Sequence, residues 1–107
     1  MKKIEGFQRK YLRGLAHNLK PLITIGQKGF TPEVQQSADQ AFNDHELIKV
    51  KFNDFKEKEH KTEICDRLEK NTDSVMVGMI GHTAIFYRQQ KDPEKRKISL
   101  PKRNNAL

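Results

Sequence analysis

The sequence predicts a single small α/β domain with the element order α-β-α-β-α-β-β and a mixed four-stranded sheet with packed helices. Three observations predict this class. Apolar residues recur at helical spacing in three stretches, and four short stretches are either apolar or alternate between apolar and polar residues. The last two of these short stretches are separated by a glycine turn, which is typical of a hairpin. A chain of 107 residues can bury one modest core.

Residues 4–19 are predicted to form an amphipathic helix. Its apolar residues recur every four positions, which places them on one helix face, and we expect this face to pack on the core. The stripe consists of Phe7, Tyr11, Leu15 and Leu19, widened by Leu12 and Ala16. Pro21 ends the helix, because the residue before a proline is driven toward extended geometry.

The next stretch predicts a strand, a second helix and a second strand. Residues 22–25 are apolar and partly β-branched, as in a buried strand. The helix over 32–43 begins after Thr31, which can cap it. Residues 47–52 alternate, so one face of this strand is covered and the other is open and basic. The covered face carries Ile48, Val50 and Phe52, and the open face carries Lys49 and Lys51.

The second half of the chain predicts a third helix and a hairpin. Residues 53–61 are almost continuously charged and predict a mobile loop or the start of this helix. Its narrow apolar stripe is Ile64, Cys65 and Leu68, and Asn71 is its predicted left-handed stop. Strands over 74–80 and 84–88 pair antiparallel, and Val75, Val77 and Met79 are expected on one face of the first. Two β-α-β crossovers predict parallel pairings.

The C-terminal part is predicted to leave the core. Residues 89–97 contain no apolar residue, so we expect them to extend from the domain without joining its core. Ile98 and Leu100 can dock locally. We therefore divide the chain into a domain over 1–97 and a basic C-terminal extension over 98–107.

The connection Gly26-Gln27-Lys28-Gly29 is the strongest candidate for a functional site. Its glycines allow positive φ and a close backbone approach, and a helix N-terminus follows it. Free amides of residues 28–30, with the Lys28 ammonium beside them, would form a phosphate cradle. The alternative is that the glycines only make a tight turn, because GxxG is short and common. It is neither a Walker loop nor a Rossmann fingerprint.

The formal charge of +7 is unevenly distributed. Residues 1–29 hold seven lysines and arginines and one glutamate, and residues 89–107 hold six basic and two acidic residues. The middle, 30–88, is acidic overall. Concentrated charge of one sign favours a polyanionic partner, here a phosphate backbone rather than a membrane surface. Basic residues expected to extend the track from the loop are Arg9, Lys10, Arg13 and Lys20, joined by Lys49 or Lys51 if the open sheet face adjoins the loop.

Other classes of function find little support in the sequence. There is no long apolar run and no signal peptide, and the single Cys65 fits a reducing compartment, so we expect a cytoplasmic protein. The four histidines are scattered, which predicts neither a metal site nor a cofactor. No catalytic constellation is present, so we expect no enzyme. Nothing predicts an obligate dimer, and we expect a monomer.

Several short motifs, in order, resemble the bacterial YhbY-like CRM-domain proteins, where CRM stands for chloroplast RNA splicing and ribosome maturation. The motifs are Tyr11-Leu12-Arg13-Gly14-Leu15-Ala16-His17, Leu19-Lys20-Pro21, Ile25-Gly26-Gln27-Lys28-Gly29-Phe30-Thr31, His45-Glu46-Leu47-Ile48-Lys49-Val50-Lys51, Ile80-Gly81-His82-Thr83, Phe86-Tyr87-Arg88 and Lys97-Ile98-Ser99-Leu100-Pro101. The resemblance implies an RNA-binding domain similar in fold to the C-terminal domain of translation initiation factor three. It also implies that Gly26, Gln27, Lys28 and Gly29 contact RNA, and that the partner is rRNA in precursors of the large ribosomal subunit.

Three other functions stay open at this point. A protein-interaction module could dock on ribosomal proteins or assembly factors. An RNA-modifying enzyme would need a cofactor loop or catalytic residues that the sequence does not offer. Charge alone would also permit DNA binding.

Overall fold

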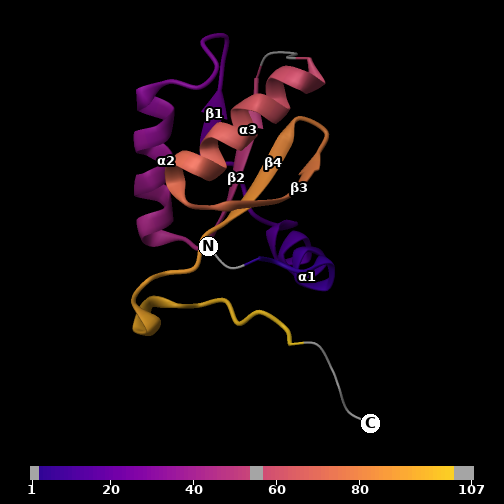
Figure 1. Ribbon diagram of the computed structural model, residues 1–107, viewed down its shortest axis with the longest axis vertical. Coiled ribbons are helices and arrows are strands. Elements are labelled where there is room, and N and C mark those ends of the chain that lie inside the picture. The colour runs from indigo at the N-terminus through magenta and orange to yellow at the C-terminus, as the bar shows by residue number, and fades with distance from the viewer. Residues whose placement is uncertain (1–2, 54–56, 103–107) are drawn as a thin grey trace.

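The computed structural model describes residues 3–53 and 57–102. In this part of the chain, helices and strands follow the predicted order (Figure 1). They are α1 (Gly6–Ala16), β1 (Ile23–Ile25), α2 (Pro32–Asp44), β2 (Leu47–Phe52), α3 (Lys58–Thr72), β3 (Val75–Ile80) and β4 (Thr83–Tyr87), followed by the short 3₁₀ turn η1 (Pro93–Lys95). None of the described helices is long and apolar enough to cross a lipid bilayer.

The strands form one mixed sheet in the order β1-β2-β4-β3. β1 and β2 are parallel, with Ile23 opposite Val50, and the other two pairs are antiparallel. The predicted mixed four-stranded sheet is confirmed. The prediction of a second parallel pair is wrong, because β4 lies between β2 and β3. β4 suits this central place because Ala84 to Tyr87 are buried, whereas β3 ends at the exposed Ile80.

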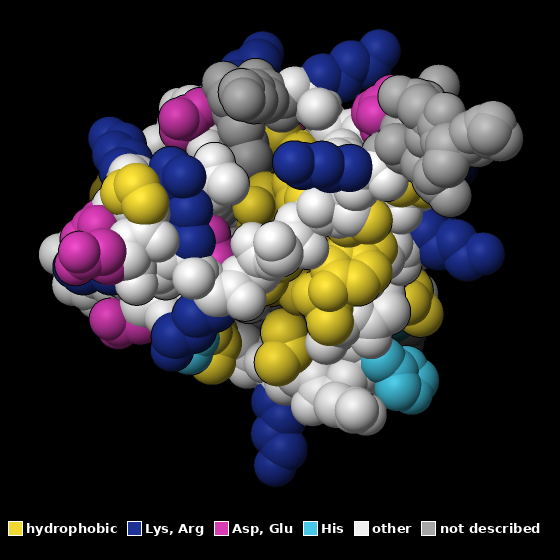
Figure 2. Space-filling model, turned by 90° about the horizontal axis from the view of Figure 1, so that it is seen from below, with side chains coloured by type: hydrophobic (Ala, Val, Ile, Leu, Met, Phe, Trp, Pro, Cys, Tyr) yellow, Lys and Arg dark blue, Asp and Glu magenta, His cyan; other side chains and the backbone are white. Residues whose placement is uncertain are grey.

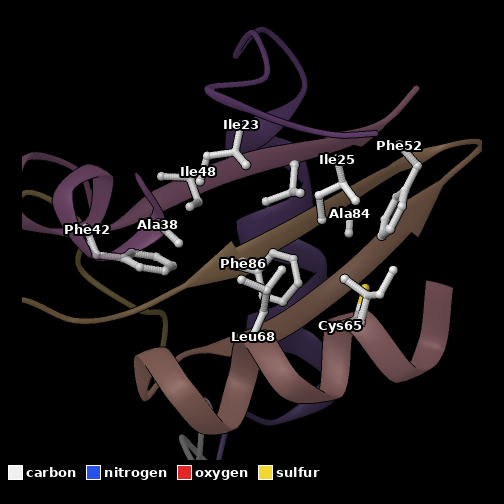
Figure 3. Close-up of a cluster of buried hydrophobic side chains, with 12 residues drawn as sticks. Ile23, Ile25, Ala38, Phe42, Ile48, Phe52, Cys65, Leu68, Ala84 and Phe86 are labelled. Atoms are coloured by element: carbon white, nitrogen blue, oxygen red, sulfur yellow. The ribbon is translucent and has the colours of Figure 1, made fainter. Parts of the chain in front are cut away.

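Two helices cover one face of the sheet and one helix covers the other (Figure 1). α2 and α3 pack on the first face, around the larger cluster of buried side chains (Figure 3). This cluster contains Ile23, Ile25, Ala38, Phe42, Ile48, Val50, Phe52, Ile64, Cys65, Leu68, Ala84 and Phe86. The predicted covered face of β2 is confirmed, since Ile48, Val50 and Phe52 all belong to this cluster. The expectation that its other face is open is wrong, because α1 packs there, Leu47 is buried and Lys49 is half-buried.

α1 packs on the opposite face, and it does so with fewer apolar residues than predicted. Leu12 and Ala16 are fully buried. Their cluster is completed by Ile4, Leu47, Val77, Ile85 and Tyr87. The stripe that recurs every four residues is exposed instead. Tyr11, Leu15 and Leu19 keep 41%, 42% and 39% of their surface accessible, so the prediction that this stripe faces the core is wrong.

Two arginines fix the orientation of α1. Arg9 Nη1 donates to the carbonyl oxygen of Met76 at 2.6 Å, and Arg13 Nη1 donates to that of Val77 at 3.0 Å. Both carbonyls belong to β3, an edge strand, whose outer backbone groups have no neighbouring strand to pair with. The stem of Arg13 lies directly on Gly78, where a Cβ would come within 2.5 Å of Arg13 Cδ.

The ladder between β3 and β4 shifts between Met76 and Gly78, which leaves Val77 as an extra residue. After this shift the alternation restarts. Met79 therefore packs against the larger cluster, whereas Val75 and Val77 belong to the cluster under α1. The predicted common face of these three residues is wrong for this reason.

α3 begins inside the predicted charged segment and ends later than predicted. It is helical from Lys58, and residues 54–56 of that segment lie outside the described residues. The left-handed residue at its end is Asp73, with φ 53°, so the predicted stop at Asn71 is wrong. Aspartate tolerates this conformation better than most residues.

A single buried carboxylate ties the C-terminal residues to the domain. Glu46 is 5% exposed, and its two side-chain oxygens accept three backbone N–H groups. The donors are the amides of Gln90, Lys97 and Ile98, at 2.9, 2.8 and 2.9 Å. Ile98 and Leu100 then pack against the cluster under α1, which confirms their local docking. Residues 89–97 belong to neither buried cluster, so the expectation that they do not join the core is confirmed, although the Glu46 contacts fix both ends of this stretch to the domain.

The hydrogen bonds of Glu46 predict that removing its charge loosens the C-terminal residues. In Glu46→Gln, one acceptor oxygen becomes an NH₂ group that cannot accept a backbone N–H. We expect the free energy of unfolding to fall by about 1–3 kcal/mol, and the amides of Gln90, Lys97 and Ile98 to exchange faster by NMR-detected hydrogen exchange. Asp44→Asn, the same change at a nearby exposed carboxylate, should leave these amides protected. Equal protection in wild type and Glu46→Gln would contradict the role of this carboxylate.

Burial of Cys65 predicts a loss of stability at alkaline pH. Desolvation, helped by Glu69 and Asp66, raises the pKa of the thiol from 9.0 to about 12. Above pH 9 the unfolded chain releases this proton and the folded chain does not, so stability falls as pH rises. Between pH 8 and 10, urea unfolding should show wild type losing about 1.4 kcal/mol more than Cys65→Ala. Parallel pH profiles for the two proteins would refute this account.

Candidate nucleic-acid interface

The loop between β1 and α2 is a tight turn followed by a capped helix. The Gly29 amide donates to the Gly26 carbonyl at 3.0 Å, and Gly29 has φ 68°, which favours glycine. Thr31 caps α2, because its Oγ1 accepts the Val34 amide at 3.2 Å. The expectation that the amides of residues 28–30 are all free is therefore wrong for Gly29. The loop still opens onto the N-terminus of α2, where the helix dipole favours an anion.

Gly26 differs from Gly29 in that the fold does not require a glycine there. Its φ is not positive, and a Cβ placed on it would meet nothing within 4 Å. Gly26, Gln27 and Lys28 are all exposed. The backbone at Gly26 is therefore open to close approach by a partner, and the exposed Lys28 belongs to the same segment.

α3 flanks the loop and adds a cation that the sequence analysis missed. A Cβ on Gly29 would lie 3.6 Å from Ile64 Cδ1, so the loop rests on α3. The guanidinium of Arg67 lies over the ring of Phe30, 4.6 Å from its centroid. Phe30 itself packs against the larger cluster. Basic and acidic residues alternate along α3, so only the spacing of Arg67 from Ile64, three residues on the same helix face, could have signalled this position.

The C-terminal ends of β1 and β2 and the β3–β4 turn meet beside the loop. Lys51 is opposite Thr24 in the register of β1 and β2, which places it at the same end of the sheet as the loop. The Phe52 amide donates to the carbonyl of His82 in the β3–β4 turn, at 2.8 Å. Nδ1 of His82 lies 2.6 Å from Nζ of the buried Lys61 on α3. This end of the molecule therefore combines an open loop backbone with several cationic side chains.

Three of the predicted track residues are instead used in holding α1. Arg9 and Arg13 donate to carbonyls of β3, as described above. Lys49 Nζ donates to the carbonyl of His17, just after α1, at 3.3 Å. These contacts reduce what the three side chains can offer a phosphate, because a partner would have to compete for the same donors.

The remaining predicted lysines are exposed but are separated from the loop. Lys10 is on α1, which lies across the other face of the sheet and toward the opposite end of the molecule (Figure 1). Lys20 precedes β1, whereas the loop follows it. Of the predicted residues, the structure therefore brings together Gly26, Gln27, Lys28, Gly29 and Lys51.

Replacing each of the two loop glycines by alanine should affect stability differently. Gly29→Ala places a Cβ at positive φ and should cost about 1–2 kcal/mol. Gly26→Ala meets no such strain and should change the free energy of unfolding by less than about 0.5 kcal/mol. Thermal or urea unfolding of both variants checks this difference, and equal destabilisation would mean that Gly26 also serves the fold.

Most of this chain resembles a known protein family. Residues 4–88 match the CRS1 / YhbY (CRM) domain. A Haemophilus influenzae protein named "RNA-binding protein" is 38% identical over 96 residues, which cover 90% of this chain and 93% of that protein. The Bacillus subtilis "Probable RNA-binding protein YqeI" is 33% identical over 98 residues, covering 92% and 99%.

A solved structure agrees with these sequence matches. The solution structure of protein SAV1595 from Staphylococcus aureus superposes with a TM-score of 0.75 at 34% identity, covering 92% of this chain and all of that one. The shared α/β fold confirms the predicted fold class. With a family match over most of its length and relatives above 30% identity, the chain belongs to the CRS1 / YhbY (CRM) domain family.

Proposed function

We propose that this protein binds structured RNA through the end of the sheet that carries the Gly26–Gly29 loop. The observation that supports this most is Gly26, which is exposed and which neither φ nor packing requires to be a glycine. The backbone at Gly26 carries no side chain and lies near a helix N-terminus and a lysine, which suits the binding of a phosphate group. Relatives of this chain are named as RNA-binding proteins, which supports RNA as the polyanion.

Three cations would surround the bound backbone. Lys28 belongs to the loop, Lys51 comes from the adjacent strand end, and Arg67 lies over Phe30 on α3. The Arg67 guanidinium stacks on the Phe30 ring, which would restrain it, so it could meet a phosphate with less loss of side-chain freedom. No exposed aromatic row adjoins the loop among the described residues, so recognition depends on the RNA backbone and shape rather than on base stacking.

The target in this proposal is rRNA in precursors of the large ribosomal subunit, whose assembly the protein assists without catalysing a reaction. This finer assignment rests on the resemblance to YhbY-like proteins and on the basic ends of the sequence. We propose that the protein acts as a monomer in the cytoplasm.

RNA-binding titrations at several salt concentrations test the loop. The probe is a structured fragment of large-subunit rRNA. The double variant Gln27→Asp/Lys28→Asp should lose tenfold or more in affinity, because it places negative charge where the phosphate would bind. About three phosphate contacts predict a log–log salt slope of magnitude about 2–3 in wild type.

A matched control is available in the C-terminal residues. Gln89→Asp/Lys91→Asp makes the same two replacements at exposed positions, remote from the loop, and should bind within about twofold of wild type. Circular dichroism and thermal unfolding would establish that both variants are folded. Equal losses in the two variants would mean that net charge, not the loop, governs binding, and equal retention would leave the loop only a turn.

A second assay separates RNA binding from docking on protein. Precursor particles treated with RNase should lose this protein if RNA holds it. Retention after RNase, together with unaffected binding of the loop variant, would instead favour a protein-interaction module. Competition with duplex DNA at fixed salt distinguishes RNA from DNA as the nucleic acid.

A further inference from the structure

The outward face of α1 carries apolar side chains that the fold does not use. Phe7, Tyr11 and Leu15 lie at intervals of four on α1, and Leu19 follows in the segment after the helix, at the same hollow as Leu15; all but Phe7 are more than a third exposed. We call these four residues the α1 stripe. Pro101 lies beside it, in a shallow hollow shared with Phe7, Tyr11 and Leu15. Figure 2 shows hydrophobic side chains gathered on this underside of the molecule, with lysines and arginines around them.

The exposure of the α1 stripe is not a consequence of a poorly docked helix. α1 is held by the buried Leu12 and Ala16 and by the two arginine contacts to β3. The α1 stripe therefore stays accessible while the helix is fixed. Contiguous apolar surface rimmed by polar groups on a small monomer usually marks an interaction site.

Gly14 adds a second, independent observation on the same face. It lies inside α1, is exposed, and a Cβ on it would meet nothing within 4 Å. A glycine inside a helix costs about 1 kcal/mol relative to alanine, and neither packing nor φ requires it here. Next to Tyr11 and Leu15, it leaves room for the backbone of a partner to approach closely.

We propose that the α1 stripe docks an amphipathic helix of another protein, with acidic residues bordering the apolar face of that helix. Phe7, Tyr11 and Leu15, at intervals of four on α1, form the kind of ridge that fits the groove of a second helix, and an apolar helix face laid on such a surface is a common mode of recognition. This site goes beyond the proposed RNA contact. It lies toward the other end of the molecule and uses none of the same residues (Figure 1).

The charges around the α1 stripe select this partner. A second hollow lies beside Leu15 and Leu19. Lys10 lines the hollow at Pro101, Lys95 and Lys97 line this second hollow, and Lys102 follows Pro101. All four lysines are exposed, whereas Asp44 is the exposed acidic residue that lines these hollows.

Other occupants fit this surface less well. A second copy of this chain would bring these lysines against one another, which disfavours a homodimer. RNA bases would find planar rings only at Phe7 and Tyr11, because leucine and proline provide no aromatic face.

Photo-crosslinking in native cells tests the proposal. A benzoylphenylalanine is placed at Leu15, and, as a control, at Gln36, which is exposed on α2 across the sheet. The proposal expects an adduct at Leu15 and not at Gln36, with the crosslinked residue mapped by mass spectrometry to an apolar helix face bordered by aspartate or glutamate. An adduct to RNA, an adduct to a second copy, no adduct, or equal labelling at both positions would each overturn it.

Affinity measurements then use the mapped segment as a synthetic peptide. Leu15→Glu should lose tenfold or more in peptide affinity. It places a polar group in the apolar contact, and its negative charge repels the acidic residues expected on the partner helix. Leu22→Glu, the same change at an exposed leucine outside the α1 stripe, should bind normally. Both variants should keep wild-type affinity for the rRNA fragment, and the Gln27→Asp/Lys28→Asp variant should keep wild-type affinity for the peptide. Equal peptide affinity for wild type and Leu15→Glu would refute the site, whatever the RNA titrations show.

Discussion

The hydrogen bonds from Arg9 and Arg13 to the carbonyls of β3 determine which surfaces of this molecule are available to partners. They join a helix near the start of the chain to an edge strand more than sixty residues later. A guanidinium is planar and carries several N–H donors in a fixed geometry. Two such groups therefore define both the position of α1 and its rotation about its own axis. Every other side chain of α1 is thereby assigned to the core or to solvent. The close approach of Arg13 to Gly78 shows that β3 is shaped to receive these contacts.

This arrangement gives the molecule two ends of different character. At one end, short strands stop beside an exposed turn, and the cations there are contributed by a loop, a strand and a helix. At the other end, a fixed helix and a tied C-terminal segment expose apolar surface with a basic border. Phosphate recognition suits the first end because backbone and charge are both accessible. Apolar docking suits the second because the helix that carries the apolar side chains is held in place without a partner, which reduces the entropic cost of binding.

Part of this could be predicted from the sequence, and part of it could not. The order of helices and strands, the cap at Thr31 and the covered face of β2 depend on local patterns, and each appears as predicted. The candidate RNA-binding loop was also visible in the sequence as a glycine pair between a strand and a helix. The side chains that lie near this loop in the folded structure could not be predicted from the sequence. Arg67 is near it only because α3 packs against the turn, and Arg9 was assigned to phosphate because an arginine that binds a carbonyl looks the same in sequence as a free one.

The sequence by itself therefore determined the element order, the fold class and the place of the loop, because these depend on residue types within a few positions of one another. The tertiary structure decided the insertion of β4 between β2 and β3, the face that α1 buries and the separation of its lysines from the loop. It also decided that Glu46 holds the C-terminal residues. Each of these depends on contacts between residues far apart in the chain. Periodicity can identify an apolar stripe, but only the packed sheet determines whether that stripe is buried or left for a partner.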